Sequence, residues 1–394
     1  DSDLILQQRI ESTKSTPVSL TLPPLQLELY RLAKEDHVLV LLTHHIVCDR
    51  WSVMVFLREL THFYGSSKET ATLPELPIQY PDWALWQRNR LKGSLLEEQL
   101  SYWKSQLSPP LPELELPSKV CKNPSHQGAH FPILIDARLT ERIKSLASQF
   151  ETSLFACLLA VFKTLLMKYC GSTDIVVGSE VANRDRTETA GLIGLLVNTL
   201  VLRTDTSGDP SFKAFVSRVK ETVEGGLAHQ DLPFEKLVET LNPDRRIEQF
   251  TPLFQVKFDL QQVHVKETEL AGLSIKPEPI PENQVKYGLR FNIQDTGETL
   301  RGQIEYSADL FDASCIARMA QHWQTLLGSV IASPEQPLSS LSILAESEKD
   351  HLWNLSQGHQ LPPTTETLHG LFETQVKHNP EAIAVVDGSS EITY

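Results

Sequence analysis

The pattern of apolar and polar positions predicts alternating strands and helices along most of the chain. Residues 37–43 (HVLVLLT) form a short run of aliphatic and β-branched side chains, which is typical of a buried strand. Apolar residues then recur at helical spacing, with polar residues on the opposite side; they are Val53, Phe56, Leu57, Leu60, Phe63 and Tyr64. The sequence therefore predicts that a strand passes into a helix between residues 43 and 53.

Later segments repeat this alternation. Further apolar runs predict strands at residues 131–135, 174–181, 197–204, 253–260, 288–295 and 300–306. Helical spacing predicts helices at 143–169, 211–227 and 312–327, the first of them either continuous or broken near residues 151–153. Gly171 is a candidate helix stop and Asp312 a candidate N-cap. The predicted fold class is mixed α/β.

Two segments interrupt these patterns. Residues 108–128 carry several prolines and are interpreted as a connection between two packed units. Residues 346–365 are polar and contain Pro362-Pro363, which favours an interdomain linker.

Composition narrows the class of protein. The 394 residues exceed one ordinary domain, and 41% of them are hydrophobic, which is enough for large cores. The net charge of −14 argues against nonspecific nucleic-acid binding, because that binding needs lysine and arginine to neutralise phosphates. No run approaches the ~18 consecutive apolar residues of a membrane span, and the first residues lack the form of a signal peptide. The five cysteines show no CxxC spacing. We therefore expect a cytoplasmic enzyme segment with free thiols, without metal, nucleic-acid or membrane partners.

Residues 44–52 (HHIVCDRWS) carry the strongest candidate chemistry. They place two imidazoles and a carboxylate where the predicted strand ends and the predicted helix begins. At such a junction, side chains can point into a cleft and free backbone N–H groups can meet developing negative charge. This combination suits acyl transfer. Adjacent strand residues point to opposite faces, so His44 and His45 are poor candidates for joint metal chelation.

Residues 44–50 resemble the HHxxxDG signature of the condensation domains of nonribosomal peptide synthetases, which belong to the chloramphenicol acetyltransferase-like superfamily. Arg50 stands in place of the final glycine. Further family landmarks follow in order at residues 80–87 (YPDWALWQ), 174–178 (DIVVG), 182–184 (ANR), 192–199 (LIGLLVNT), 229–235 (HQDLPFE) and 252–256 (PLFQV). The C-terminal segments 371–373, 379–386 and 391–394 resemble the opening of an amino-acid adenylation domain.

The resemblance implies two acetyltransferase-like lobes in a V arrangement, with the histidine loop midway along a tunnel between them. Residues 1–120 would be the remainder of an N-terminal lobe whose early strands and helix are missing, and residues 125–345 the C-terminal lobe. Residues 346–365 would be the linker and residues 366–394 the start of the adenylation domain. An incomplete first lobe leaves apolar faces uncovered, so we expect the isolated chain to express poorly.

The resemblance also implies a reaction. A condensation domain transfers a donor acyl or peptidyl group from a thioester to the amine of an acceptor aminoacyl thioester, which forms a peptide bond. Both substrates would arrive on phosphopantetheine arms of upstream and downstream peptidyl carrier domains, so the segment itself is expected to bind no cofactor. The adjacent adenylation domain would be a further partner in the same polypeptide. Two alternatives are a catalytically inactive condensation-like docking domain and a free-standing acyltransferase that uses coenzyme A. The adenylation-like tail argues against the second.

Within the motif, His45 matches the family's second histidine and is the candidate to accept the amine proton or to hold the nucleophile. A structural hydrogen-bonding role is the alternative for His45 and the expected role for His44. Asp49 is a candidate helix cap or ion-pair member rather than an acid–base catalyst, and the resemblance makes Arg184 its partner. Removing one member of a buried ion pair costs about 3–5 kcal/mol, so loss of Asp49 could abolish activity through collapse of the site.

The remaining candidate residues have two interpretations each. Arg50 either narrows the tunnel, at a cost of about 1–2 kcal/mol if its φ is positive, or turns outward and contributes only its backbone N–H. Trp51 and Ser52 favour the outward orientation, because they continue the motif into the helix. Asn198 and Gln255 either orient acyl or amine groups in the tunnel or satisfy backbone groups of strands.

Overall fold

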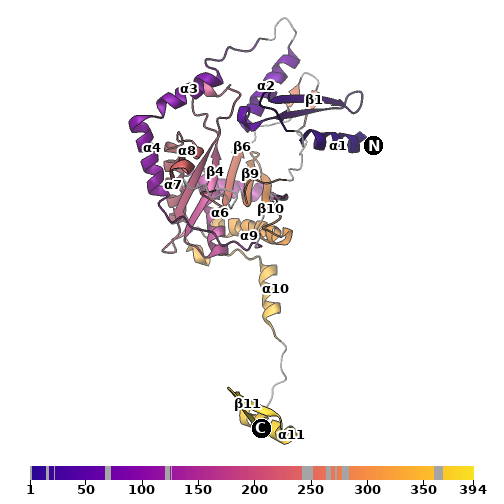
Figure 1. The fold of residues 1–394 in the computed structure, drawn as a ribbon, viewed down its shortest axis with the longest axis vertical. Coiled ribbons are helices and arrows are strands. Elements are labelled where there is room, and N and C mark those ends of the chain that lie inside the picture. Colours follow the sequence, from indigo (N-terminus) through magenta and orange to yellow (C-terminus); the bar gives the residue numbers. More distant parts are fainter. Residues whose placement is uncertain are drawn as a thin grey trace. The chain divides into compact units, whose positions relative to one another are not determined.

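The structure is a computed structural model that describes residues 2–14, 17–21, 23–66, 72–119, 125, 127–241, 252–262, 268–270, 273–276, 284–358 and 367–394. It divides into two compact units, Asp1–Ile343 and Leu344–Tyr394 (Figure 1). The predictions that concern Cys121 and Pro362-Pro363 lie outside the described residues.

A six-stranded mixed sheet forms the centre of the first unit (Figure 1), with the strand order β3-β10-β9-β6-β4-β5. The strands are β3 (Gly128–Ile135), β4 (Asp174–Val181), β5 (Asn198–Asp205), β6 (Val256–Gln262), β9 (Leu289–Asp295) and β10 (Leu300–Ser307). β6 pairs in parallel with both β4 and β9, whereas the other neighbours are antiparallel. The predicted mixed α/β class is confirmed.

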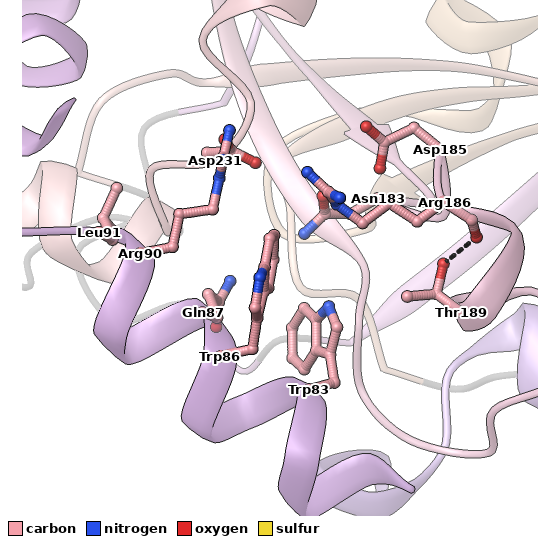
Figure 2. A pocket seen from close by; sticks show the side chains of 10 residues that line it. All are labelled: Trp83, Trp86, Gln87, Arg90, Leu91, Asn183, Asp185, Arg186, Thr189 and Asp231. Atoms are coloured by element: carbon pink, nitrogen blue, oxygen red, sulfur yellow. Dashed lines mark hydrogen bonds and ion pairs between the residues drawn. The ribbon is translucent and has the colours of Figure 1, made fainter. Parts of the chain in front are cut away.

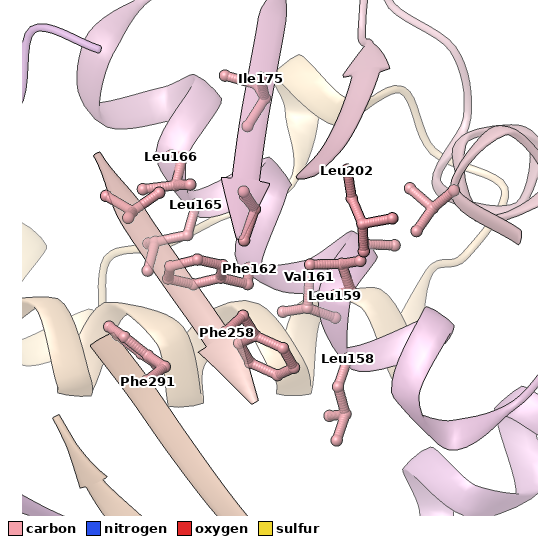
Figure 3. Close-up of a cluster of buried hydrophobic side chains, with 14 of the residues drawn as sticks. Leu158, Leu159, Val161, Phe162, Leu165, Leu166, Ile175, Leu202, Phe258 and Phe291 are labelled. Carbon is pink, nitrogen blue, oxygen red and sulfur yellow. The ribbon is translucent and has the colours of Figure 1, made fainter. Parts of the chain in front are cut away.

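Amphipathic helices pack on the apolar face of this sheet. They are α5 (Ala137–Gln149), α6 (Leu154–Cys170), α7 (Phe212–Ala228) and α9 (Ala313–Ala332). Phe162 of α6 stacks on Phe258 of β6, and its ring centroid lies 4.6 Å from that of Phe291 on β9 (Figure 3). Trp323 of α9 packs edge-on against Phe291. The main hydrophobic core therefore lies between the sheet and these helices.

The helical region near residue 150 is broken, which settles one of the two alternatives left open by the sequence. α5 ends at Gln149, and Ser153 caps α6 by accepting a hydrogen bond from the backbone N–H of Ala156. Gly171 ends α6 in a left-handed conformation with φ of 66°, as its residue type predicts. Among the described residues, no single helix has the length and apolar character needed to cross a membrane; only the bent pair α5 and α6 meets that test when taken together.

The N-terminal part of the first unit carries the histidine motif. Its elements are α1 (Ser2–Lys14), β1 (Leu25–Arg31), β2 (His37–Thr43), the 3-10 helix η1 (His45–Val47) and α2 (Arg50–Gly65). The strand at β2 and the helix at α2 agree with the prediction. The histidines lie between these two elements, as predicted, where His44 caps the short helix η1 and His45 is its first residue. The turn arises because the His44 imidazole Nδ1 accepts the backbone N–H of Ile46.

Helices α3 (Tyr80–Arg90) and α4 (Gly93–Gln106) connect the motif to the sheet. Trp103 of α4 and the following Leu107 are buried in the main core, so residues that the sequence placed with the first lobe pack against the large sheet. Shorter elements complete the described first unit: η2 (Thr187–Thr189), α8 (Phe234–Leu241), β7 (Thr268–Leu270), β8 (Leu273–Ile275) and η3 (Leu338–Ser340).

The second unit is small. It contains α10 (Glu346–Ser356), α11 (Leu368–His378), β11 (Ile383–Asp387) and β12 (Ser390–Thr393), and the two strands form an antiparallel pair. The segment 346–365, expected to be a linker, thus includes helix α10. Residues 359–366 lie outside the described residues.

Candidate functional site

Asp49 is the structural centre of the histidine motif. It is the N-cap of α2, and its Oδ1 accepts the backbone N–H of Ser52 at 2.8 Å and the Ser52 hydroxyl at 2.7 Å. Such a cap satisfies a helix N–H that would otherwise lack a partner. The capping role expected for Asp49 is therefore present.

The ion pair expected between Asp49 and Arg184 is also present. One guanidinium nitrogen of Arg184 donates to both carboxylate oxygens of Asp49, at 3.0 and 3.1 Å. The two side chains are only 4% and 1% exposed. Asn183, directly before Arg184, adopts a left-handed conformation with φ of 52°, which asparagine tolerates better than most residues. This backbone turn accompanies the inward placement of Arg184.

A third segment, residues 192–196, completes this buried network. The backbone N–H of Leu196 donates to Asp49 Oδ2 at 3.1 Å, and the backbone N–H of Gly194 donates to the Ser52 hydroxyl at 3.0 Å. Gly194 must be glycine because a Cβ there would overlap the Tyr80 ring. The network therefore joins the loop before α2 to residues about 140 positions away in the sequence.

Electrostatics keep Asp49 ionised. Burial opposes the charged form, but hydrogen bonds from Ser52 and Leu196 and the charge of Arg184 outweigh it and lower the pKa of the Asp49 carboxyl. With its oxygens occupied by these donors, Asp49 is suited to hold the loop and has no proton to exchange.

His45 lies on the exposed side of this braced loop. Glu180, on β4, has a lowered carboxyl pKa despite burial, chiefly because of Lys257 and Arg290; His45 is the smallest of the contributing charges. The loop held by Asp49 and Arg184 thus presents an accessible imidazole.

Arg50 is the first residue of α2 and has helical backbone geometry, so the position does not demand glycine. The strain considered for a positive φ is absent. The Arg50 side chain is exposed, and its charge interacts with Arg290, Glu180 and Glu305 of the sheet. Although the residue is exposed, partial desolvation of its guanidinium and the neighbouring Arg290 charge lower the pKa of that group, which nonetheless stays protonated at neutral pH.

The other predicted support residues make structural contacts. The Asn198 amide donates to the carbonyls of Gln230 and Leu232, and its oxygen accepts the backbone N–H of Phe234. Gln255 accepts the backbone N–H of Leu114 at 2.5 Å. For both residues, the structure therefore shows the backbone-satisfying contacts that were one of the two expectations.

Trp51, on the surface of α2, adds contacts to the network around Asp49 and Arg184. Its indole N–H donates to the carbonyl of Ala190 at 2.9 Å, and the guanidinium of Arg184 lies 5.8 Å from the centre of its ring. Trp51 thus ties the first turn of α2 to the segment that follows Arg184.

A separate hollow lies between α3 and residues 183–189 (Figure 2). Trp86 stands there between two guanidiniums, with Arg186 4.4 Å and Arg90 5.3 Å from its ring centroid. Trp83 and Trp103 are buried in hydrophobic clusters, whereas Trp86 is 36% exposed. The hollow is not lined by any of the predicted site residues.

Sequence reasoning missed two parts of the site. The first is the buried anchor formed by Gly194 and Leu196; the motif at residues 192–199 was noticed, but its contact with Asp49 was not. The second is the ion-pair cluster on the sheet, which includes Glu180 and Arg290. Its signal was available in the strands, where charged and apolar residues alternate, as in Lys257-Phe258-Asp259.

The fold and the site together define a mixed α/β enzyme of the acyl-transfer type, in which an accessible histidine stands on a loop braced by a buried carboxylate–arginine pair. The sequence matches the family model "Condensation domain" over residues 2–353. The chain belongs to this family, the condensation domains of nonribosomal peptide synthetases.

Known relatives agree with this assignment. The chain is 37% identical over 379 residues to malpibaldin synthetase of Mortierella alpina, covering 94% of this chain and 7% of that protein. It is 33% identical over 391 residues to surfactin synthase subunit 1 of Bacillus subtilis, covering 98% of this chain and 11% of that protein. The chain therefore spans only a small part of the curated relatives that it matches.

Solved structures show the same fold. The X-domain from teicoplanin biosynthesis superposes with a TM-score of 0.77 at 27% identity, over 86% of this chain and 79% of that one. The four-domain nonribosomal peptide synthetase holo-AB3403 superposes with a TM-score of 0.78 at 21% identity, over 98% of this chain and 30% of that one.

Proposed function

We propose that this segment forms a peptide bond between a donor acyl or peptidyl thioester and the amine of an acceptor aminoacyl thioester, with His45 at the reacting centre. The observation that carries the proposal is the buried Asp49–Arg184 pair, which holds the loop so that the His45 imidazole stays on its accessible side. Family membership supports the same reaction.

The protein does not need to activate the acyl donor for this reaction. A thioester is an activated acyl donor, so the acceptor amine can attack its carbonyl carbon without a covalent enzyme intermediate. An α-amino group with a pKa of about 7.7–8.0 is partly neutral near pH 7, so alignment matters beside proton removal. His45 accepts the proton of the attacking nitrogen as the tetrahedral intermediate forms, and returns it to the departing thiolate.

Backbone groups at the start of α2 are suited to the developing oxyanion. The N–H of Ser52 is already bound to Asp49, whereas the N–H groups of Arg50 and Trp51 make no hydrogen bond within the described part of the chain. Free N–H groups at a helix N-terminus stabilise negative charge. Arg50 would then act through its main chain, which is compatible with a side chain in place of glycine.

The substrates reach this site on phosphopantetheine arms of upstream and downstream peptidyl carrier domains, and an adenylation domain follows in the same polypeptide. We infer that residues 1–120 and 125–345 act as two lobes around the channel for these arms, that residues 346–365 connect to the next domain, and that residues 366–394 begin the adenylation domain. The contact of α11 with the residue that follows β12 is compatible with such a start, since the Phe372 and Tyr394 ring centroids lie 5.1 Å apart.

The test is a product assay of the native polypeptide with loaded donor and acceptor carrier domains. The His45→Ala variant should lose about 10²- to 10⁴-fold in the rate of dipeptide formation, which is the usual worth of general-base assistance. His37→Ala is the control, because His37 is an exposed histidine at the start of β2. Equal product from wild-type and His45→Ala proteins would instead favour an inactive docking domain.

A further inference from the structure

Helix α3 contacts a segment of the chain that holds Asp49. Two motifs of the sequence, residues 80–87 and 192–199, meet in this contact. Residues 192–196, which we call the anchor segment, supply two backbone N–H groups to the buried network, one bound to Asp49 and one to Ser52. Any group that fixes the anchor segment therefore also fixes Asp49.

One peptide unit of the anchor segment is bound at both ends. The Tyr80 hydroxyl donates to the carbonyl oxygen of Leu195 at 3.0 Å. The N–H of the same peptide unit, which belongs to Leu196, donates to Asp49 Oδ2 at 3.1 Å. Because the amide is planar, its C=O and N–H cannot turn independently, so the first bond orients the second. In such a chain each hydrogen bond also polarises the next and strengthens it.

The ring of Tyr80 is held on two sides. Gly194 leaves the space for it, since a Cβ at that position would overlap the ring. The ring centroid of Trp83, three residues along α3, lies 5.6 Å from that of Tyr80, and Trp83 is buried with Leu192 and Leu196. The phenol therefore cannot shift away from the anchor segment without losing this packing.

The Tyr80 phenol is a hydrogen-bond donor at neutral pH. Burial and the nearby charge of Asp49 raise the pKa of its hydroxyl, which keeps the hydroxyl protonated. On the other side of the anchor segment, the backbone N–H of Gly194 donates to the Ser52 hydroxyl of α2 at 3.0 Å. The anchor segment is thus held between α2 and α3.

Asp49 is joined to His45 by a short stretch of chain. Only Cys48 separates Asp49 from η1, and the backbone N–H of Cys48 donates to the His45 carbonyl at 3.3 Å. Asp49 also caps α2, so a movement of its carboxylate would move the start of this helix together with the turn before it. The position of the His45 imidazole therefore depends on the contacts of Asp49.

Resting on the function proposed above, we propose that Tyr80 is a positioning residue, whose hydroxyl orients the Leu195–Leu196 peptide that holds Asp49 and thereby the loop that presents His45. Tyr80 touches no reacting atom in this scheme and acts through Asp49. Amide formation should be sensitive to this contact, because a misplacement of about 1 Å at a reacting group can lower a rate about 100-fold.

A purely structural role for Tyr80, as packing against Gly194 and Trp83, makes a different prediction. Only the ring would then matter, so Tyr80→Phe would form product at the wild-type rate. A small loss of stability would also leave the rate unchanged, because nearly all chains stay folded. Tyr102→Phe is the matched control, since Tyr102 is also partly buried, lies on the next helix, α4, and stacks on His229.

The experiment measures the single-turnover rate of amide formation in the native polypeptide with both carrier domains loaded. Tyr80→Phe keeps the ring and is expected to fold. It should lower the rate about three- to tenfold, which is the usual worth of one hydrogen bond. Hydrogen-exchange mass spectrometry should show the Leu196 amide exchanging faster by about the same factor, while the amides of β5 keep their wild-type exchange. Tyr102→Phe should change neither the rate nor the exchange of Leu196.

A wild-type rate of amide formation in Tyr80→Phe would overturn the inference. Faster exchange spread equally over Leu196 and β5 would overturn it too, because that result marks general destabilisation, and so would an equal loss of rate in Tyr102→Phe. Failure of the proposed function looks different. His45→Ala would then form product at the wild-type rate, and exchange of the Leu196 amide would still decide whether the Tyr80 hydroxyl holds the loop. If His45→Ala is impaired while Tyr80→Phe matches the wild type, only the role of Tyr80 is wrong.

Discussion

Removal of Asp49 should destabilise the first unit strongly, and the structure gives the magnitude. Asp49→Ala leaves the Arg184 guanidinium, 1% exposed, without its counter-charge. An uncompensated buried charge costs about 3–5 kcal/mol. The backbone N–H of Leu196 also loses its acceptor, which adds on the order of 1 kcal/mol. Because domains are stable by only about 5–15 kcal/mol, this variant should lie close to unfolding.

A double-mutant cycle separates this ion pair from its surroundings. Arg184→Met should be destabilising by a similar amount, because Asp49 would then be the unpaired charge. The double variant Asp49→Ala/Arg184→Met leaves no buried charge at the site, so it should be more stable than the sum of the single variants by about 2 kcal/mol or more. Urea unfolding of the wild type, the two single variants and the double variant measures their free energies of unfolding. Hydrogen exchange of the Leu196 backbone amide reports local opening at the site. Additive single and double variants would refute the argument.

The pH dependence of the same variants gives an independent check. The pKa of Asp49 is lowered in the folded state, so its contribution to stability is complete above the ordinary value of 3.8 and is lost as the pH falls through the lowered pKa. Wild-type stability should therefore fall more steeply below about pH 4 than that of Asp49→Ala. Parallel curves for the two proteins would contradict an ionised, hydrogen-bonded Asp49.

Two further variants test other features of the first unit. Burial lowers the pKa of Lys163, which is 0% exposed, to about 7, so the unfolded chain holds more protons between pH 7 and 10.5 and stability should rise with pH in that window. Urea unfolding at pH 7 and pH 9 should show a gain of about 2 kcal/mol that Lys163→Met abolishes; an equal gain in both proteins would exclude Lys163 as its source. Arg50→Gly should leave amide formation nearly unchanged in the native polypeptide, because Arg50 has helical backbone geometry and an exposed side chain. A large gain in turnover would show that the native arginine obstructs the channel.

Local sequence signals were sufficient for the elements that position the site. The strand at residues 37–43 coincides with β2, and the end of α6 falls at Gly171, because apolar periodicity and the left-handed preference of glycine are properties of a few adjacent residues. Boundaries set by tertiary contacts were less predictable. Helix α9 continues to Ala332, past the predicted end at residue 327, because Leu326, Leu327 and Val330 are buried in the core.

The buried network that holds the histidine loop illustrates what a local pattern cannot give. Arg184 was named as the partner of Asp49 only through resemblance to a family, since 135 residues separate them and no periodicity links them. Ser52 and Leu196 complete the same network through a hydroxyl and a backbone N–H. Their roles depend on the approach of residues 192–196 to α2, which is a consequence of the whole fold.

The charged residues on one face of the large sheet were within reach of sequence reasoning; they are Glu180, Lys257, Asp259, Arg290 and Glu305. A strand that packs against helices on one side and carries charged residues on the other must alternate between apolar and polar residues, as Phe258 and Asp259 do. Five ionisable groups on such a face would be costly if isolated, because buried charges require partners. Their mutual ion pairs make the surface stable and, as a consequence, rigid. The contacts that hold these strands together therefore also fix the positions of the charged side chains on this face.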